Sequence, residues 1–228
     1  SWGYIETVDH IRGLKYTQTF HNNLETIDPP KITKISSSKP YTKVVFIPDF
    51  ARLGLSGFSK DMVALMMKRV NDICAMTDQS QKKIKVICNG NTLSIKNFSQ
   101  YLDLYIGSKD ENKRIYENHS DRWEYAVALS PKNEFMQVSF VNGICTPKGG
   151  KHVDYILGQI VRKLCAYIEK KKKITCNPAT IKEQIMLFIR CDIENPSFDS
   201  QTKDYMNTPS VKFGSQCVVS DTFIEKIA

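Results

Sequence analysis

Residues 191–203 read C-D-I-E-N-P-S-F-D-S-Q-T-K, and they mark the point where a buried strand gives way to an exposed loop. The apolar run at residues 185–193 is typical of a buried strand, and Pro196 ends it because proline has no N–H to donate to a sheet. The loop at residues 197–200 then leads to Gln201, Thr202 and Lys203. An ammonium on such a loop can act as a point charge for a phosphate group and stabilise phosphoryl transfer. Lysine and glutamine on a loop are, by themselves, more often only solvated.

The long helix expected before this strand carries a run of lysines. Apolar residues recur at helical spacing from residue 151 to residue 172. At the C-terminal end of this helix lie Lys170, Lys171, Lys172 and Lys173. Positive charge is favourable at a helix C-terminus, and it can also contact the phosphates of duplex DNA. The K-G-G-K-H segment at residues 148–152 does not have phosphate-loop spacing, so we interpret it as a turn, with His152 a helix-start histidine whose hydrogen bonds are satisfied.

The N-terminal part of the chain predicts a small all-β block. Its strands are expected at residues 5–8, 15–21, 31–35 and 43–47. A connector rich in glycine and serine follows at residues 48–59, and Ser59 can cap a helix over residues 60–76. The spacing of the apolar side chains predicts that this helix turns one face to the core, with residues that include Met62, Leu65, Met66 and Ile73.

The middle of the chain predicts short elements. We expect a strand at residues 83–88, a tight Asn89-Gly90 turn, a returning strand at 93–95 and a short helix at 98–105. Residues 107–119 are polar and predict an exposed loop, and residues 122–129 and 135–141 predict an antiparallel hairpin. One helical turn is expected at 179–184, and Ser220 can cap a final helix. The fold class is therefore α/β (α+β), a mixed β-sheet backed by helices.

Composition limits the class of protein and the kind of partner. The net charge of +8 and the pI of about 9.0 favour a polyanionic partner, although a basic balance can also serve only solubility. No apolar run is long enough to span a bilayer, so no membrane partner is expected. The seven cysteines are odd in number and lack C-x-x-C spacing, which favours reduced thiols and no metal site. The opening S-W-G-Y is no signal peptide and carries no methionine, which favours a segment of a longer protein.

Nearly the whole chain resembles one known family. The block E-N-P-S-F-D-S-Q-T-K at residues 194–203 resembles the lysine loop of eukaryotic-type DNA topoisomerase II. Further blocks agree with the same family in the same order: D-M-V-A-L-M (61–66), N-G-N (89–91), R-W-E (122–124), V-S-F-V-N (138–142), K-G-G-K-H-V-D-Y (148–155) and F-G-S (213–215). The resemblance implies a transducer domain at residues 60–228 with a left-handed βαβ crossover. Residues 1–47 would be the last strands of a GHKL-type ATP-binding domain, and residues 48–59 a connector.

The resemblance also implies roles for individual residues. Lys203 would be catalytic and reach the γ-phosphate of ATP bound in the preceding domain, with Gln201 and Thr202 beside the same phosphate. Lys170, Lys171, Lys172 and Lys173 would match a lysine-rich loop that senses DNA. Glu169 departs from this pattern, because members of the family often have lysine there.

For the parent enzyme, the resemblance implies ATP and Mg²⁺ as cofactors and duplex DNA as a partner. The parent would be a nuclear homodimer with an ATP-binding domain upstream of this chain and a cleavage core downstream. The nucleotide-binding motifs of the family and its cleavage tyrosine are missing here, so the chain alone is expected to be inactive and to bind no cofactor. Two alternatives stay open: a stand-alone basic nucleic-acid-binding module, and the transducer of another GHKL ATPase.

Overall fold

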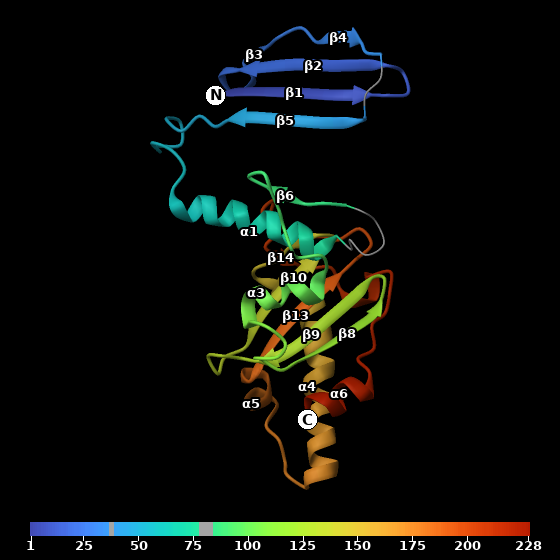
Figure 1. Cartoon of the computed structure of the whole chain (residues 1–228). Helices are drawn as coiled ribbons and strands as arrows, with labels where there is room; N and C mark the ends of the chain where they lie inside the picture. The colour runs from blue at the N-terminus through green and yellow to red at the C-terminus, as the bar shows by residue number, and fades with distance from the viewer. Residues whose placement is uncertain (37–38, 78–83) are drawn as a thin grey trace. The chain divides into compact units, whose positions relative to one another are not determined.

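The computed structural model describes residues 1–36, 39–77 and 84–228. They divide into two compact units, Ser1–Val63 and Ala64–Ala228. Each unit is built on a sheet of its own (Figure 1). The helix α1 (Lys60–Met76) begins in the first unit and continues into the second. The domain limits expected from the sequence stay a prediction.

The first unit is a five-stranded antiparallel sheet with the order β3-β2-β1-β5, and β4 also pairs with β2. Its elements are β1 (Trp2–Asp9), β2 (Leu14–His21), the short helix η1 (Asn22–Leu24), β3 (Thr26–Ile27), β4 (Lys31–Lys34) and β5 (Tyr41–Ile47). The four strands expected here are confirmed. Ile32 on β4 and Val44 and Phe46 on β5 are each more than 60% exposed, and the strand register puts them on the same face, so this face of the sheet exposes apolar side chains at both of its edges.

The second unit is organised around the mixed sheet β11-β10-β13-β9-β8. Its strands are β8 (Arg114–Ser120), β9 (Trp123–Leu129), β10 (Met136–Val141), β11 (Ile144–Cys145) and the central β13 (Ile185–Cys191). β13 runs parallel to β10 and antiparallel to β9. Both faces of β13 are buried, and its alternate residues contribute to separate core clusters. This explains its unbroken apolar sequence.

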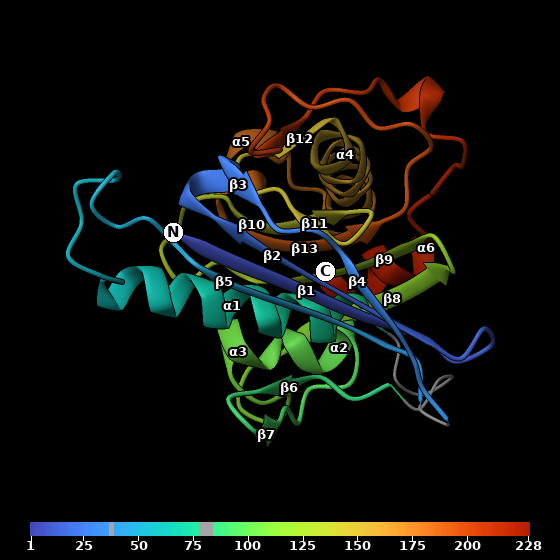
Figure 2. The same ribbon diagram turned by 90° about the horizontal axis from the view of Figure 1, so that it is seen from above.

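Helices cover both faces of this sheet. Figure 2 shows α4 (Lys151–Lys172) on one side and α2 (Phe98–Tyr101) and α3 (Asp103–Ile106) on the other. The remaining elements are β6 (Ile87–Cys88), β7 (Asn91–Thr92), β12 (Gly149–Gly150), α5 (Pro178–Glu183), β14 (Tyr205–Met206), η2 (Ser210–Lys212) and α6 (Asp221–Ile227). The helices expected at residues 60–76 and 151–172 are confirmed, and so are the caps: Ser59 accepts the N–H of Met62, and Ser220 accepts that of Phe223.

Two expectations about the sheet are wrong. Residues 107–119 are not one exposed loop, because residues 114–120 form the edge strand β8, paired with β9. β8 is an edge strand with one solvated face, so its sequence is polar and predicts a loop instead of a strand. Residues 122–129 and 135–141 do not pair as a hairpin, because β13 lies between β9 and β10. Side chains buried on both faces carry no alternation that would identify the neighbouring strand.

The middle segment is less regular than expected. The strand expected at 83–88 starts at residue 83, which lies outside the described residues, and the described pairing is confined to β6 and β7. Asn89 and Gly90 do form the tight turn, with φ of 50° and 79°. The single helix expected at 98–105 is split into α2 and α3.

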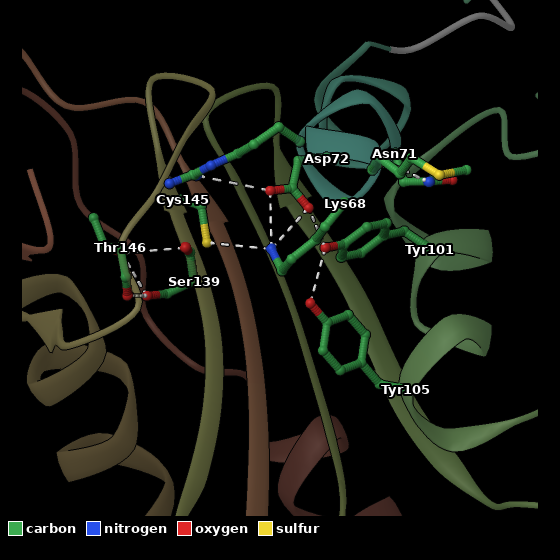
Figure 3. Close-up of polar contacts among 10 residues, drawn as sticks. Lys68, Asn71, Asp72, Tyr101, Tyr105, Ser139, Cys145 and Thr146 are labelled. Carbon is green, nitrogen blue, oxygen red and sulfur yellow. Dashed lines mark hydrogen bonds and ion pairs between the residues drawn. The ribbon is translucent and has the colours of Figure 1, made fainter. Parts of the chain in front are cut away.

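Within the second unit, a buried carboxylate connects α1 to the neighbouring helix α2 (Figure 3). Asp72 is 4% exposed and accepts two hydrogen bonds from the Lys68 ammonium, at 2.9 and 3.0 Å. The hydroxyl of Tyr101 donates to the same carboxylate at 2.5 Å. Burial is the larger cause and this hydrogen bond the second cause that raise the pKa of Tyr101. The buried side of α1 is therefore Asp72, Cys74 and Ala75, whereas Leu65, Met66 and Ile73, expected in the core, are exposed.

Candidate functional site

Residues 198–206 form a short hairpin that presents Gln201, Thr202 and Lys203. Phe198 bridges Met206 in antiparallel fashion, and the Asp199 N–H donates to the carbonyl of Tyr205 at 3.1 Å. The Lys203 N–H donates to the carbonyl of Ser200 at 3.1 Å and closes the tip. Gln201 and Thr202 are exposed, and Lys203 is half-buried. The structure therefore brings the three residues together on one turn.

The ammonium of Lys203 has no carboxylate partner among the described residues. Its Nζ lies 5.7 Å from the ring centroid of Phe198. The acidic neighbours are engaged elsewhere: Asp199 accepts the N–H of Tyr205 at 3.3 Å, and Asp204 pairs with Lys148 at 3.3 Å. Asp199 therefore shapes the turn, because both its side chain and its N–H are bonded to Tyr205. A cation with no carboxylate beside it can accept an anion without first losing an ion pair.

The base of the hairpin is attached to the N-terminus of α4. The Lys148 N–H donates to the carbonyl of Asp204 at 3.0 Å, and β12 pairs in parallel with β14. At Gly150, φ is 144°, and a Cβ there would overlap the backbone of Met206. Only glycine allows two backbones to approach this closely. The glycine pair is therefore a structural turn, as expected.

A second anchor comes from Arg122, whose role the sequence did not reveal. Its guanidinium donates to the carbonyl of Asp192 at 3.0 Å and to that of Gly214 at 3.0 Å, and it forms an ion pair with Glu194 at 3.1 Å. It thus joins the turn before β9 to the segments on both sides of the hairpin. An arginine that donates hydrogen bonds to carbonyls of distant segments produces no recognisable pattern in the local sequence.

The four lysines lie at the C-terminal end of α4. Lys170, Lys171 and Lys172 form its last turn, and Lys173 ends it in the left-handed region with φ of 58°. All four are exposed, and no ion pair is found for them in the described part of the chain. Because α4 has 22 residues, about 33 Å separate this lysine cluster from the hairpin end of the helix. The two predicted sites are thus at opposite ends of one helix (Figure 1).

His152 is a buried neutral histidine. Its side chain is fully buried, and burial lowers its pKa to about 3. Its Nε2 lies 3.2 Å from Thr146 Oγ1, but its Nδ1 has no hydrogen-bond partner among the described residues. The expectation of a helix-start histidine is confirmed, while its hydrogen bonds are only partly satisfied.

The cysteines are free thiols, in agreement with the expectation from their spacing. Within residues 1–36, 39–77 and 84–228, no group of three or more His, Cys, Asp or Glu side chains is placed to hold a metal ion. The helices of that same part of the chain are all too short or too polar to cross a membrane.

Comparison with known proteins identifies relatives along the whole chain. Residues 97–228 match the family model described as DNA gyrase B. DNA topoisomerase 2 of Candida glabrata is 42% identical over 239 residues, covering 98% of this chain and 17% of the relative. DNA topoisomerase 2 of Saccharomyces cerevisiae is 39% identical, with 98% and 16% covered. The chain thus spans less than a fifth of the length of these curated relatives.

Solved structures match the fold closely. The ATPase region of Saccharomyces cerevisiae topoisomerase II, bound to ICRF-187, superimposes with a TM-score of 0.88 at 40% identity. The match covers 99% of this chain and 57% of that one. The ATPase and transducer domains of DNA topoisomerase II from Balamuthia mandrillaris give a TM-score of 0.88 at 37% identity, again with 99% and 57% covered.

Proposed function

Because the chain belongs to the family of DNA gyrase B and eukaryotic DNA topoisomerase II, we propose that it senses bound ATP within an ATP-dependent type II DNA topoisomerase. It would couple ATP binding and hydrolysis to the opening of a DNA gate and the passage of one duplex through another. The observation that carries this proposal is the ammonium of Lys203, which has no ion-pair partner among the described residues and lies on an anchored, exposed hairpin.

Lys203 would act on the terminal phosphate of ATP. Negative charge shifts within the phosphate chain during phosphoryl transfer, and a fixed ammonium beside it lowers the barrier. The hairpin suits this role, because its tip is exposed while its base is bonded to residues 148–150 in front of α4. Gln201 and Thr202, on the same turn, would hydrogen-bond the phosphate or its water.

The nucleotide itself would be bound outside this chain. We propose that residues 1–47 are the last strands of an ATP-binding domain, that residues 48–59 are a connector and that residues 60–228 are the transducer. The exposed apolar face of the first sheet, with Ile32, Val44 and Phe46, is the kind of surface that the rest of such a domain would cover. Mg²⁺ would be bound there together with ATP.

The lysine cluster would contact DNA. Lys170, Lys171, Lys172 and Lys173 are exposed and form no ion pair in the described part of the chain, so they can neutralise backbone phosphates without regard to base sequence. The parent enzyme would be a nuclear homodimer with a cleavage core after this chain. The crossover from β10 through α4 to β13 would be left-handed, as the resemblance implies.

The test of the ATP-sensing role is turnover in a protein that combines this chain with its ATP-binding domain. We expect Lys203→Ala to lower kcat for ATP hydrolysis about 100-fold while KM changes little, since the ammonium acts on charge that develops in the transition state. Lys212→Ala, which removes another exposed lysine of the same unit, is the matched control. An unchanged kcat in Lys203→Ala would leave a basic nucleic-acid-binding module as the better account.

A further inference from the structure

Thr146 is the centre of a buried hydrogen-bond network beneath the Lys203 hairpin. Its side chain is fully buried, and its Oγ1 lies 2.6 Å from Ser139 Oγ, 3.1 Å from the carbonyl of Ser139 and 3.2 Å from His152 Nε2. Its N–H donates to the carbonyl of Ser139 at 2.8 Å. Figure 3 shows Thr146 beside Ser139 on β10. One threonine therefore joins β10 to the start of α4.

The protons in this network can be assigned. A hydroxyl has one proton and two lone pairs. The one proton of the Ser139 hydroxyl has two acceptors in reach, Thr146 Oγ1 at 2.6 Å and the carbonyl of Thr146 at 3.1 Å, and we assign it to the nearer Oγ1. If Thr146 donates to the carbonyl of Ser139, it can accept from both Ser139 Oγ–H and His152 Nε2–H, so its three contacts are satisfied. His152 is then protonated on Nε2, and its Nδ1, which has no partner among the described residues, is a bare acceptor. The opposite tautomer would bury an unpaired N–H, which native proteins rarely tolerate.

The backbone of Thr146 continues the network toward the hairpin. Its carbonyl accepts the N–H of Gly149 at 2.8 Å and so closes a tight turn. This turn places Lys148 against Asp204 and Gly150 against Met206. Asp204 follows Lys203 directly in the sequence. The turn at residues 146–149 thus sets where the second strand of the hairpin lies.

We propose that Thr146 is a positioning residue for Lys203. Its hydroxyl fixes the turn at residues 146–149 on β10 and on the start of α4, and that turn fixes the backbone immediately after Lys203. The inference rests on the proposed role of Lys203 at the terminal phosphate. A change at Thr146 should therefore affect turnover more than ATP affinity, because the lysine remains present while its placement loses precision.

The first experiment measures the hairpin directly in the 228-residue chain. We compare amide hydrogen exchange in wild type, Thr146→Val, which removes the hydroxyl at similar volume, and Thr146→Ser, which keeps it. We expect amides at residues 203–207 to exchange about ten-fold faster in Thr146→Val and to stay within about two-fold of wild type in Thr146→Ser. Amides of β9 should be unchanged and report an intact fold.

A matched control and a second variant complete the set. Ser130 is also a buried hydroxyl, and it donates to the carbonyl of Glu134 at 2.6 Å in the loop between β9 and β10. Ser130→Ala should leave the hairpin amides unchanged. Should Thr146→Val fail to fold, Ser139→Ala removes the partner hydroxyl instead and should also speed exchange at residues 203–207. Hairpin amides that exchange as in wild type in a folded variant would overturn the inference.

The second experiment measures ATP hydrolysis in the protein that includes the ATP-binding domain. We expect Thr146→Val to lower kcat about ten-fold with KM for ATP within about two-fold, and Thr146→Ser to restore kcat. A loosened hairpin with unchanged kcat would overturn the positioning role. The proposed function is judged separately, because its test is Lys203→Ala and not any variant of Thr146.

Discussion

Acidification should destabilise the second unit through His152. The folded-state pKa of this histidine is about 3 against an ordinary value of 6.5, because its ring is buried. Below pH 6.5 the unfolded chain binds a proton that the folded chain cannot accept, so the free energy of unfolding falls as the pH falls. The free energy of unfolding begins to fall near pH 6.5 and continues to fall toward pH 3.

The size of this effect follows from the two pKa values. Each pH unit below about 6.5 costs about 1.4 kcal/mol until the folded-state pKa is reached. Between about pH 7.5 and about pH 5.0, His152 alone should therefore lower the free energy of unfolding by about 2 kcal/mol. The orphan Nδ1 adds no compensating bond, because no described residue is placed to receive a proton from it.

The assay is urea unfolding followed by tryptophan fluorescence. The chain has two tryptophans, and Trp123 is fully buried in the second unit, whereas Trp2 lies in the first. A Trp2→Phe background therefore makes the fluorescence report the second unit alone. In this background, His152→Gln is the comparison, because its amide can still donate to Thr146 but does not titrate near neutral pH.

Over the same pH interval, the difference in unfolding free energy between the Trp2→Phe background and its His152→Gln variant should change by about 2 kcal/mol in favour of the variant. Other titrating groups act on both proteins and cancel in this difference. Parallel pH profiles for the two proteins would refute the reasoning, since they would mean that His152 can take up a proton in the folded state.

Three further predictions concern other parts of the second unit. Asp72→Ala should lower the free energy of unfolding by about 3 kcal/mol, because it leaves the Lys68 ammonium and the Tyr101 hydroxyl without their buried acceptor. Urea unfolding measures this loss, and a loss below about 1 kcal/mol would contradict the prediction. Gly150→Ala should release the base of the hairpin from α4, seen as faster amide exchange at residues 203–207, and wild-type exchange there would count against the close backbone approach. Changing Lys170 through Lys173 to glutamine should flatten the slope of log K against log salt for duplex DNA by up to about 3.6, whereas the double variant Lys31→Gln/Lys34→Gln should leave it unchanged.

The sequence was sufficient for the two long helices and for the tip of the hairpin. Helical spacing located α1 and α4, and the Ser59 cap located the start of α1, since both are local properties of the chain. Pro196 and the polar residues after it located the exposed turn that ends at Lys203. These features depend on neighbours within a few residues, which is the range over which sequence patterns are informative.

Long-range choices could not be read in the same way. The place of β13 between β9 and β10 depends on packing across the whole sheet. The buried side of α1 is set by a carboxylate that finds Lys68 and Tyr101, and a polar residue of this kind reads as solvent-facing in sequence. Thr146 likewise has the appearance of an ordinary loop residue, although it is buried and makes contacts to β10 and α4.

The length of α4 gives it the mechanics of a lever. The Lys203 hairpin is bonded to Gly149 and Gly150, directly in front of α4, and the four lysines lie at the other end of the helix, about 33 Å away. A tilt of about 10° around the hairpin end would carry the lysines through about 6 Å. Successive phosphates on one DNA strand are about 3.4 Å apart along the axis. A rotation that moves the hairpin end of α4 very little would therefore shift the lysines by a distance close to the spacing of two phosphates on a DNA strand.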